Sequence, residues 1–198
     1  MYRLSSTALA TCLIVATLLI FPGIAYLNQA MSGSYGIATH QETSIDFTWQ
    51  DIHGRNHQFS DWRQGPSYLF LGFLNCSQIC PIRTHQVQTL WQQLNEQEQS
   101  QLRFMFITID PQNDLPALRE QMIDSQSAQF VSAELPRGQL AKLQRQLAEK
   151  SSFNDDLGEH SGHLYLISKE GKLSQTYTQR QLDSNKLLTD LKTLMHSK

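Results

Sequence analysis

The chain has 198 residues, and its 16 lysines and arginines nearly balance its 18 aspartates and glutamates, giving a formal net charge of −2. The charges are well mixed and form no basic stripe or tail, which argues against a nucleic acid as a partner. Three cysteines are too few for a disulfide-rich scaffold.

The N-terminal segment is hydrophobic and has to be separated from the fold. No charged residue lies between Arg3 and Glu42, and residues 8–26 form an uncharged run of 19 residues. At about 1.5 Å per helical residue, this run nearly spans a hydrocarbon core of about 30 Å. Because Arg3 is the only charge before the run, the positive-inside rule keeps the N-terminus cytoplasmic and sends the rest of the chain across the membrane.

Two interpretations of this segment compete. A signal peptide would be cleaved after Ala25, whereas an uncleaved signal-anchor explains why the apolar run is longer than a usual signal core. We favour the anchor. Residues 1–28 are then a transmembrane segment, residues 29–44 a flexible tether, and residues 45–198 one domain on the periplasmic or equivalent extracytoplasmic side. About 150 residues suffice for one domain with a sizeable core.

The apolar periodicity predicts a hairpin and then alternating strands and helices. Residues 67–73 and 104–109 are apolar on both faces, as expected for strands covered on two sides. Asp114 and Pro116 predict the N-cap and first turn of one helix. The hairpin is predicted at residues 47–59. It is followed by a strand at 67–73, a helix at 81–94, a strand at 104–109 and two helices at 114–122 and 140–147. Two strands at 164–167 and 173–177 and a last helix at 187–194 complete the order.

This order of elements predicts the fold class. Buried strands that alternate with helices indicate a central sheet with helices on both faces. A β-α-β unit followed by a β-β-α unit is the thioredoxin arrangement. We therefore expect an α/β, thioredoxin-like fold with an N-terminal β-hairpin extension, preceded by one transmembrane helix.

Cys76 and Cys80 lie where the first central strand leads into its helix. A helix N-terminus offers the positive end of the dipole and free backbone N–H groups, which favour thiolates. Pro81 suits the first turn, and Arg83 is a candidate for further thiolate stabilisation. The four-residue spacing places both sulfurs on one face, close enough for one metal ion or one disulfide. A purely structural disulfide is the weaker interpretation, because closing so short a loop contributes only about 2 kcal/mol.

His160 is the third candidate ligand. It precedes the strand predicted at residues 164–167, and in the thioredoxin fold this loop faces the cysteine site. Disulfide oxidoreductases place a cis-proline there, but the last proline of this chain is Pro136. Two thiolates and one imidazole form a soft, low-coordination set that suits Cu(I). Structural zinc needs four ligands, which His163 or Glu159 would have to complete, so zinc is the weaker alternative.

Four ordered motifs, spread over residues 47–194, are similar to those of a known family. They are Cys76/Cys80-Pro81 after an apolar strand, residues 107–111 with Asp114, Glu159-His160-Ser161, and Tyr165-Leu166 leading to Gly171. The chain thus resembles the Sco/SenC family, thioredoxin-like copper proteins implicated in assembling cytochrome c oxidase. The resemblance implies that Cys76, Cys80 and His160 are copper ligands and that Asp110 lies near them.

The chain departs from the family pattern beside these ligands. The family usually has Pro-Asp after the first cysteine, where this chain has Ser77-Gln78, and Asp before the histidine, where this chain has Glu159. The departures leave the ligands in place but change the face that would dock a partner.

The leading hypothesis is a copper-binding metallochaperone, not an enzyme. It would deliver copper to the copper-site subunit of a membrane-bound respiratory oxidase, or keep the thiols of that site reduced. One alternative is an enzyme, a thiol–disulfide oxidoreductase or a peroxide-reducing protein that uses Cys76 and Cys80 without a metal. Another is a copper-responsive redox sensor. His160 and the missing cis-proline favour the chaperone over the oxidoreductase, but the sequence does not separate it from the sensor.

Overall fold

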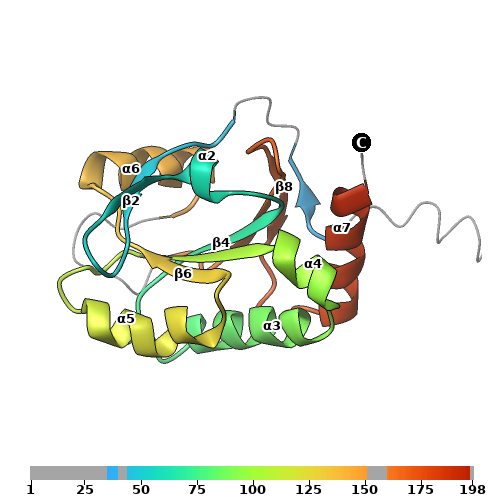
Figure 1. The fold of residues 1–198 in the computed structure, drawn as a ribbon, viewed down its shortest axis with the longest axis horizontal. Coiled ribbons are helices and arrows are strands. Elements are labelled where there is room, and N and C mark those ends of the chain that lie inside the picture. The colour runs from blue at the N-terminus through green and yellow to red at the C-terminus, as the bar shows by residue number, and fades with distance from the viewer. Residues whose placement is uncertain (1–34, 40–43, 151–159, 197–198) are drawn as a thin grey trace, which may run out of the picture. The chain divides into compact units, whose positions relative to one another are not determined.

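The structure is a computed structural model that describes residues 35–39, 44–150 and 160–196 (Figure 1). The predicted transmembrane segment, residues 1–28, lies outside the described residues. Within the described ranges, no helix is both long enough and apolar enough to cross a membrane. The compact unit that contains the described residues begins at Tyr35.

Eight strands and a set of mostly short helices make up the described part of the chain. The strands are β1 (Ile37–Ala38), β2 (Thr48–Gln50), β3 (Asn56–Gln58), β4 (Ser67–Gly72), β5 (Arg103–Thr108), β6 (Phe130–Ala133), β7 (Leu164–Ile167) and β8 (Leu173–Tyr177). The helices are α2 (Phe59–Trp62), α3 (Cys80–Gln92), α4 (Glu96–Gln101), α5 (Pro116–Met122), the 3-10 turn η1 (Asp124–Gln126), α6 (Arg137–Gln146) and α7 (Ser184–His196).

Six strands form one central sheet in the order β1-β8-β7-β4-β5-β6. Strand β4 pairs with β5 in parallel and with β7 antiparallel, so that Phe70 lies opposite Phe106 on one side and Leu164 on the other. Strands β7 and β8 are antiparallel, and β5 and β6 are parallel. The unit β4-α3-β5 followed by β7-β8-α7 confirms the predicted thioredoxin-like α/β fold.

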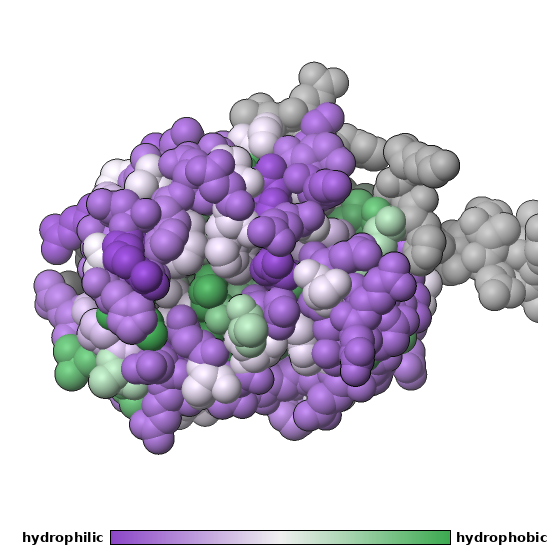
Figure 2. All heavy atoms as spheres, in the orientation of Figure 1, coloured by the Kyte–Doolittle hydropathy of each residue, from purple (hydrophilic) through white to green (hydrophobic). Residues whose placement is uncertain are grey.

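Alternating side chains of the sheet enter two hydrophobic cores, one on each face. Tyr68 and Phe70 of β4 pack with residues of α3 and α7, whereas Leu69 and Leu71 pack with α6, α2 and the β2–β3 hairpin. Figure 1 shows the sheet between α3 on one side and α6 with α2 on the other. Burial on both faces explains why this strand is a continuous apolar run. The outer surface in Figure 2 is mainly hydrophilic, with small hydrophobic patches.

The N-terminal hairpin is confirmed as β2 and β3, which form a separate two-stranded sheet. Gln50 of β2 also pairs with Glu134, and this bridge joins the hairpin to the chain just after β6. The periodicity missed α4 and β6. Helix α4 is a short polar helix that buries none of its residues and begins with a capping box at Asn95. Short elements of this kind carry little apolar periodicity.

The predicted N-cap role of Asp114 is wrong. Helix α5 begins after Leu115 without a side-chain cap, and Asp114 is buried instead. Its carboxylate accepts hydrogen bonds from the Thr108 hydroxyl (2.6 Å) and from the backbone N–H of Leu74 (2.9 Å). Because a buried carboxylate needs donors, Asp114 bonds to the end of β5 and to the loop after β4 instead of to the helix N-terminus.

Strand β1 lies within the range predicted as a tether, residues 29–44, and pairs with β8. The carboxylate of Asp190 on α7 accepts hydrogen bonds from the backbone N–H groups of Tyr35 and Gly36, both at 3.1 Å. It also accepts one from the hydroxyl of Tyr177 (3.0 Å). The chain is therefore attached to the folded unit from Tyr35 onward.

Candidate metal centre

The two cysteines lie on the segment that joins β4 to α3. The backbone N–H of Cys76 donates to the carbonyl of Phe73 (3.2 Å), which closes a turn after β4. Helix α3 then begins at Cys80, with Pro81 in its first turn as predicted. Gly72 ends the strand directly under this helix, and a Cβ there would lie 2.9 Å from the Cys80 sulfur. The close approach of backbone and sulfur thus requires glycine at this position.

His160 lies in the loop that enters β7. Its ring contacts the ring of Phe73 edge-on, with centroids 5.3 Å apart. Two residues later, Gly162 adopts a left-handed conformation with φ +63°, and a Cβ there would lie 2.7 Å from the side chain of Ile79. The histidine loop therefore packs against the residue that immediately precedes Cys80.

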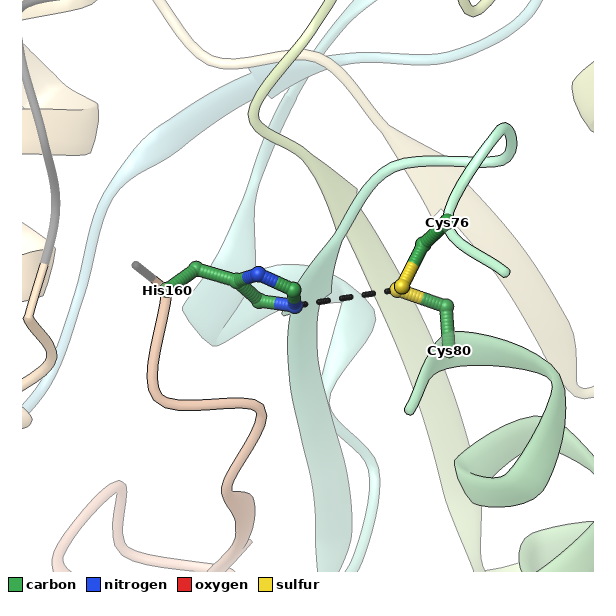
Figure 3. A group of neighbouring side chains, drawn as sticks. All are labelled: Cys76, Cys80 and His160. Atoms are coloured by element: carbon green, nitrogen blue, oxygen red, sulfur yellow. Dashed lines mark hydrogen bonds between the residues drawn. The ribbon is translucent and has the colours of Figure 1, made fainter. Parts of the chain in front are cut away.

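The fold brings the three predicted ligands together. The sulfurs of Cys76 and Cys80 and a ring nitrogen of His160 all lie within 4.8 Å of one another, and Nε2 of His160 is 3.7 Å from Sγ of Cys80. Figure 3 shows the three side chains pointing toward one another. Metal–donor bonds of about 2.0–2.3 Å, as zinc makes, place two donors at most about 4.6 Å apart. Small side-chain rotations thus suffice to bring all three donors onto one ion.

The two thiols have different environments although both are free and largely buried. Burial opposes ionisation of Cys76, but hydrogen bonds from the backbone N–H groups of Cys80, Gln78 and Ile79 outweigh it and lower the pKa of Cys76. Burial raises the pKa of Cys80, and the neighbouring Cys76 adds to the effect. The helix N-terminus therefore favours the thiolate of the first cysteine, as predicted, and the core holds the second as a thiol in the metal-free protein.

A pocket of about 420 Å³ opens beside Cys76 and His160. Its polar rim includes the exposed side chains of Asn75, Gln78 and Arg180. Cys76 contributes to its lining and Cys80 does not, although both sulfurs belong to the same buried core. The arrangement leaves the first sulfur and the imidazole within reach of an incoming donor atom.

Other residues considered from the sequence have different roles. His163 does not join the three ligands: its Nδ1 lies 3.5 Å from the hydroxyl of Tyr165. Glu159 lies outside the described residues. The carboxylate of Asp110 accepts hydrogen bonds from the amide of Asn113 (2.9 and 3.0 Å), and it is Asp114 that contacts the loop leading to Cys76.

The position of Arg83 one turn after Cys80 suggested that its guanidinium stabilises a thiolate, but the structure shows other partners. The side chain donates instead to the backbone carbonyls of Gly162, Gln179 and Arg180. The sequence also held no sign of Glu149, whose carboxylate accepts the backbone N–H of Ser161. Both contacts join residues far apart in the chain, and local patterns do not report such contacts.

Comparisons with known proteins agree with this geometry. The family model described as SCO1/SenC matches residues 36–196. A SCO2-like protein of Rickettsia prowazekii is 26% identical over 175 residues, which cover 81% of this chain and 85% of that protein.

Solved structures share the fold. Apo Sco1 from Thermus thermophilus matches with a TM-score of 0.68 and 19% identity, over 83% of this chain and 99% of that one. Yeast Sco1 with copper bound matches with a TM-score of 0.63 and 20% identity, over 79% of this chain and 88% of that one. The thioredoxin domain of a thiol-disulfide oxidoreductase from Bacteroides vulgatus matches with a TM-score of 0.54 and 13% identity, over 83% of this chain and 100% of that domain. With a family model that spans most of its length and a thioredoxin-like fold that carries Cys76, Cys80 and His160 side by side, the chain belongs to the SCO1/SenC family.

Proposed function

We propose that this protein is a copper-binding metallochaperone that holds one copper ion between Cys76, Cys80 and His160. The observation that carries the proposal is the convergence of these three donors, within 4.8 Å, from segments 80 residues apart in the chain. Two sulfurs and one imidazole suit Cu(I), because soft thiolates select it and low coordination satisfies it. Membership of the SCO1/SenC family and the copper-bound yeast Sco1 structure support the same metal.

The asymmetry of the site supports transfer of the metal. Cys76 and His160 line the open pocket, whereas Cys80 is not part of its lining, although both cysteines are buried. Three protein donors leave room for a donor of the acceptor protein to bind the ion before the chain releases it. We propose the copper-site subunit of a membrane-bound respiratory oxidase as the acceptor, because the Sco/SenC family is implicated in assembling such sites.

The location follows from the N-terminal segment. Residues 1–28 form, in this proposal, an uncleaved anchor that leaves the domain on the periplasmic or equivalent extracytoplasmic side. The anchor keeps the site near a membrane-bound acceptor. The described contacts of Tyr35 and Gly36 with Asp190 shorten the length of chain between the anchor and the folded domain.

Metal analysis of the full-length chain tests the proposal. The chain is purified reduced and anaerobically, and offered copper and zinc in turn. We expect one copper per chain, held against a competing Cu(I) chelator, and no zinc at comparable affinity, since structural zinc takes four ligands. Preferential zinc binding, or no metal at all, would contradict the assignment. Loss of copper from a respiratory oxidase on deletion of the gene would identify the acceptor.

Thiol–disulfide exchange is the second candidate, and the difference between the two thiols favours it. A lowered pKa at Cys76 and a raised pKa at Cys80 suit an attacking and a resolving thiol. Against it, the rings of Phe73 and His160 lie beside the sulfurs, where an extended polypeptide would have to dock.

Reduction of insulin disulfides separates the two candidates. A chaperone reduces insulin far more slowly than a thioredoxin assayed alongside, and His160→Ala does not lower that slow rate, because the histidine acts as a ligand. Robust turnover that falls in His160→Ala would make the oxidoreductase the better assignment.

A further inference from the structure

Arg83 is a buried cation whose hydrogen-bond acceptors are all neutral. Its side chain is 1% exposed, and none of the ion pairs in the described part of the chain includes it. Nη1 donates to the amide oxygen of Gln86 (2.8 Å) and to the carbonyl of Arg180 (3.3 Å), and Nη2 donates to the carbonyl of Gln179 (2.6 Å). Burial of a charge without a counter-ion is costly, so these bonds are needed to retain it.

The fourth bond of Arg83 connects the two parts of the metal centre. Its Nε donates to the carbonyl of Gly162 (2.8 Å), two residues after His160. Arg83 itself is three residues after Cys80 on α3. One buried side chain thus joins the helix that carries a sulfur to the loop that carries the imidazole.

Glu149 holds the same loop from its other side. Its carboxylate is largely buried beyond the end of α6, where Ala148 adopts a left-handed φ of +51°. Oε1 accepts the backbone N–H of Ser161 (2.7 Å), and Oε2 accepts a hydrogen bond from the hydroxyl of Tyr165. The next residue, Lys150, donates its backbone N–H to the hydroxyl of Ser161 (2.9 Å).

We propose that Arg83 and Glu149 are positioning residues of the metal centre. Together they hold residues 160–162 against α3, so that the His160 imidazole faces the two sulfurs before any metal arrives. The part of this inference that concerns copper rests on the proposed function. The part that concerns the order of the loop stands on the metal-free geometry alone.

The test is a double-mutant cycle on the full-length chain. Arg83→Lys keeps the charge but loses the planar fork that spans the carbonyls of Gly162 and Gln179. The Cu(I) dissociation constant is measured by chelator competition for the wild type, Arg83→Lys, His160→Ala and the double variant. Loss of outer-shell partners typically weakens metal binding by about 10–100-fold, and we expect that range for Arg83→Lys. In the His160→Ala background the same change has no further effect, because the residue acts through the histidine.

Arg119→Lys is the matched control. Arg119 is equally buried at 1% exposure, and its ion-pair partner among the described residues is Glu134 (3.5 Å). This change also replaces a buried guanidinium by an ammonium, but the hydrogen bond of Arg119 goes to Glu134 and not to residues 160–162. We therefore expect wild-type copper affinity for Arg119→Lys, even if its stability falls. Glu149→Gln is the second variant and follows the same cycle, with a smaller effect because its amide oxygen still accepts one of the two hydrogen bonds.

Each outcome decides a different statement. Equal losses in the wild-type and His160→Ala backgrounds, or no loss in either, would overturn the positioning role. A wild type that binds no copper, or binds it equally without His160, would overturn the proposed function instead. In that case amide exchange of Ser161 and Gly162 in the metal-free chain still tests the inference. Arg83→Lys must accelerate it relative to Arg119→Lys, and unchanged exchange rejects the role of Arg83.

Discussion

The segments that carry the sulfurs and the imidazole are held in place by different kinds of contact. From Cys76 into the first turn of α3 the backbone bonds are local: Cys76 N–H donates to the Phe73 carbonyl, and Arg83 N–H donates to the Ile79 carbonyl. The loop before them has one distant partner, because the backbone N–H of Leu74 donates to the carboxylate of Asp114, 40 residues away. In the histidine segment the backbone bonds come from far along the chain, because Ser161 bonds to Glu149 and Gly162 to Arg83. The strand-to-helix turn therefore brings the sulfurs together largely by itself, whereas only the folded domain places the imidazole beside them.

Removal of either sulfur is the change with the largest expected effect. Cys76→Ala or Cys80→Ala should abolish Cu(I) binding, because one thiolate and one imidazole no longer form the pair of soft ligands that selects this ion. Ser77→Ala, an exposed change between the two cysteines, is the control and retains copper. Copper that survives in either cysteine variant, measured by chelator competition, would place the metal elsewhere.

Removal of the imidazole tests the other segment. His160→Ala should weaken Cu(I) binding by about 100-fold or more, which exceeds the loss of affinity expected when only a hydrogen-bond partner of a ligand is removed. Some binding should remain, because two thiolates still bind Cu(I) linearly. X-ray absorption should show the nitrogen donor lost and both sulfurs kept. His53→Ala, on the exposed turn of the hairpin, is the control. An unchanged affinity would remove His160 from the site.

A methyl group added at Gly72, next to the Cys80 sulfur, is a milder change. Gly72→Ala places a Cβ 2.9 Å from the Cys80 sulfur and 2.8 Å from the Phe70 ring, so overpacking should cost about 1–3 kcal/mol of stability and weaken copper binding. Gly138→Ala, with nothing within 4 Å, should instead stabilise the protein by about 0.4–1 kcal/mol and leave the metal site unchanged. Denaturant unfolding measures both. Equal stability of the two variants would contradict this prediction, because it would mean that the Cys80 sulfur can move away from the added methyl group at little cost.

The smallest expected effect is a difference in reactivity between the thiols. The pKa of Cys76 is lowered by backbone N–H groups against the effect of burial, and burial raises that of Cys80. In the reduced, metal-free chain a pulse of iodoacetamide should therefore label Cys76 at a pH below the ordinary thiol pKa, and Cys80 only well above it. Peptide mass spectrometry across a pH series reads both sites. Coincident labelling curves would contradict the different environments of the two thiols.

The same shifts set the direction of the pH dependence of stability. The depressed pKa of Cys76 contributes stability that is present above the pKa of the unfolded chain and is lost as the pH falls through the folded value. The raised pKa of Cys80 contributes stability that is complete below the unfolded pKa and is lost as the pH rises above it. As the pH rises from neutral, the free energy of unfolding should therefore begin to fall at a lower pH in the wild type than in Cys80→Ala, each compared with its own value at neutral pH.

Much of the fold was predictable because its elements carry local patterns. The two-sided apolar runs at β4 and β5, the spaced leucines of α6 and α7, and the order of these elements indicated a thioredoxin-like sheet. The short β6 and the polar α4 were missed because neither has an apolar repeat long enough to detect. Strand β1 was missed because its pairing with β8 and the contacts of Asp190 with Tyr35 and Gly36 cross most of the chain.

The sequence by itself determined the donor set: two thiols one turn apart at the start of a helix, followed much later by a histidine at the entrance to a strand. Only the tertiary structure decided how the histidine is held. Arg83 turns from the thiols to the carbonyl of Gly162, and Glu149 binds the N–H of Ser161. A buried charged group takes whichever hydrogen-bond partners the packed chain brings within reach, and those partners lie 79 and 12 residues away in the sequence.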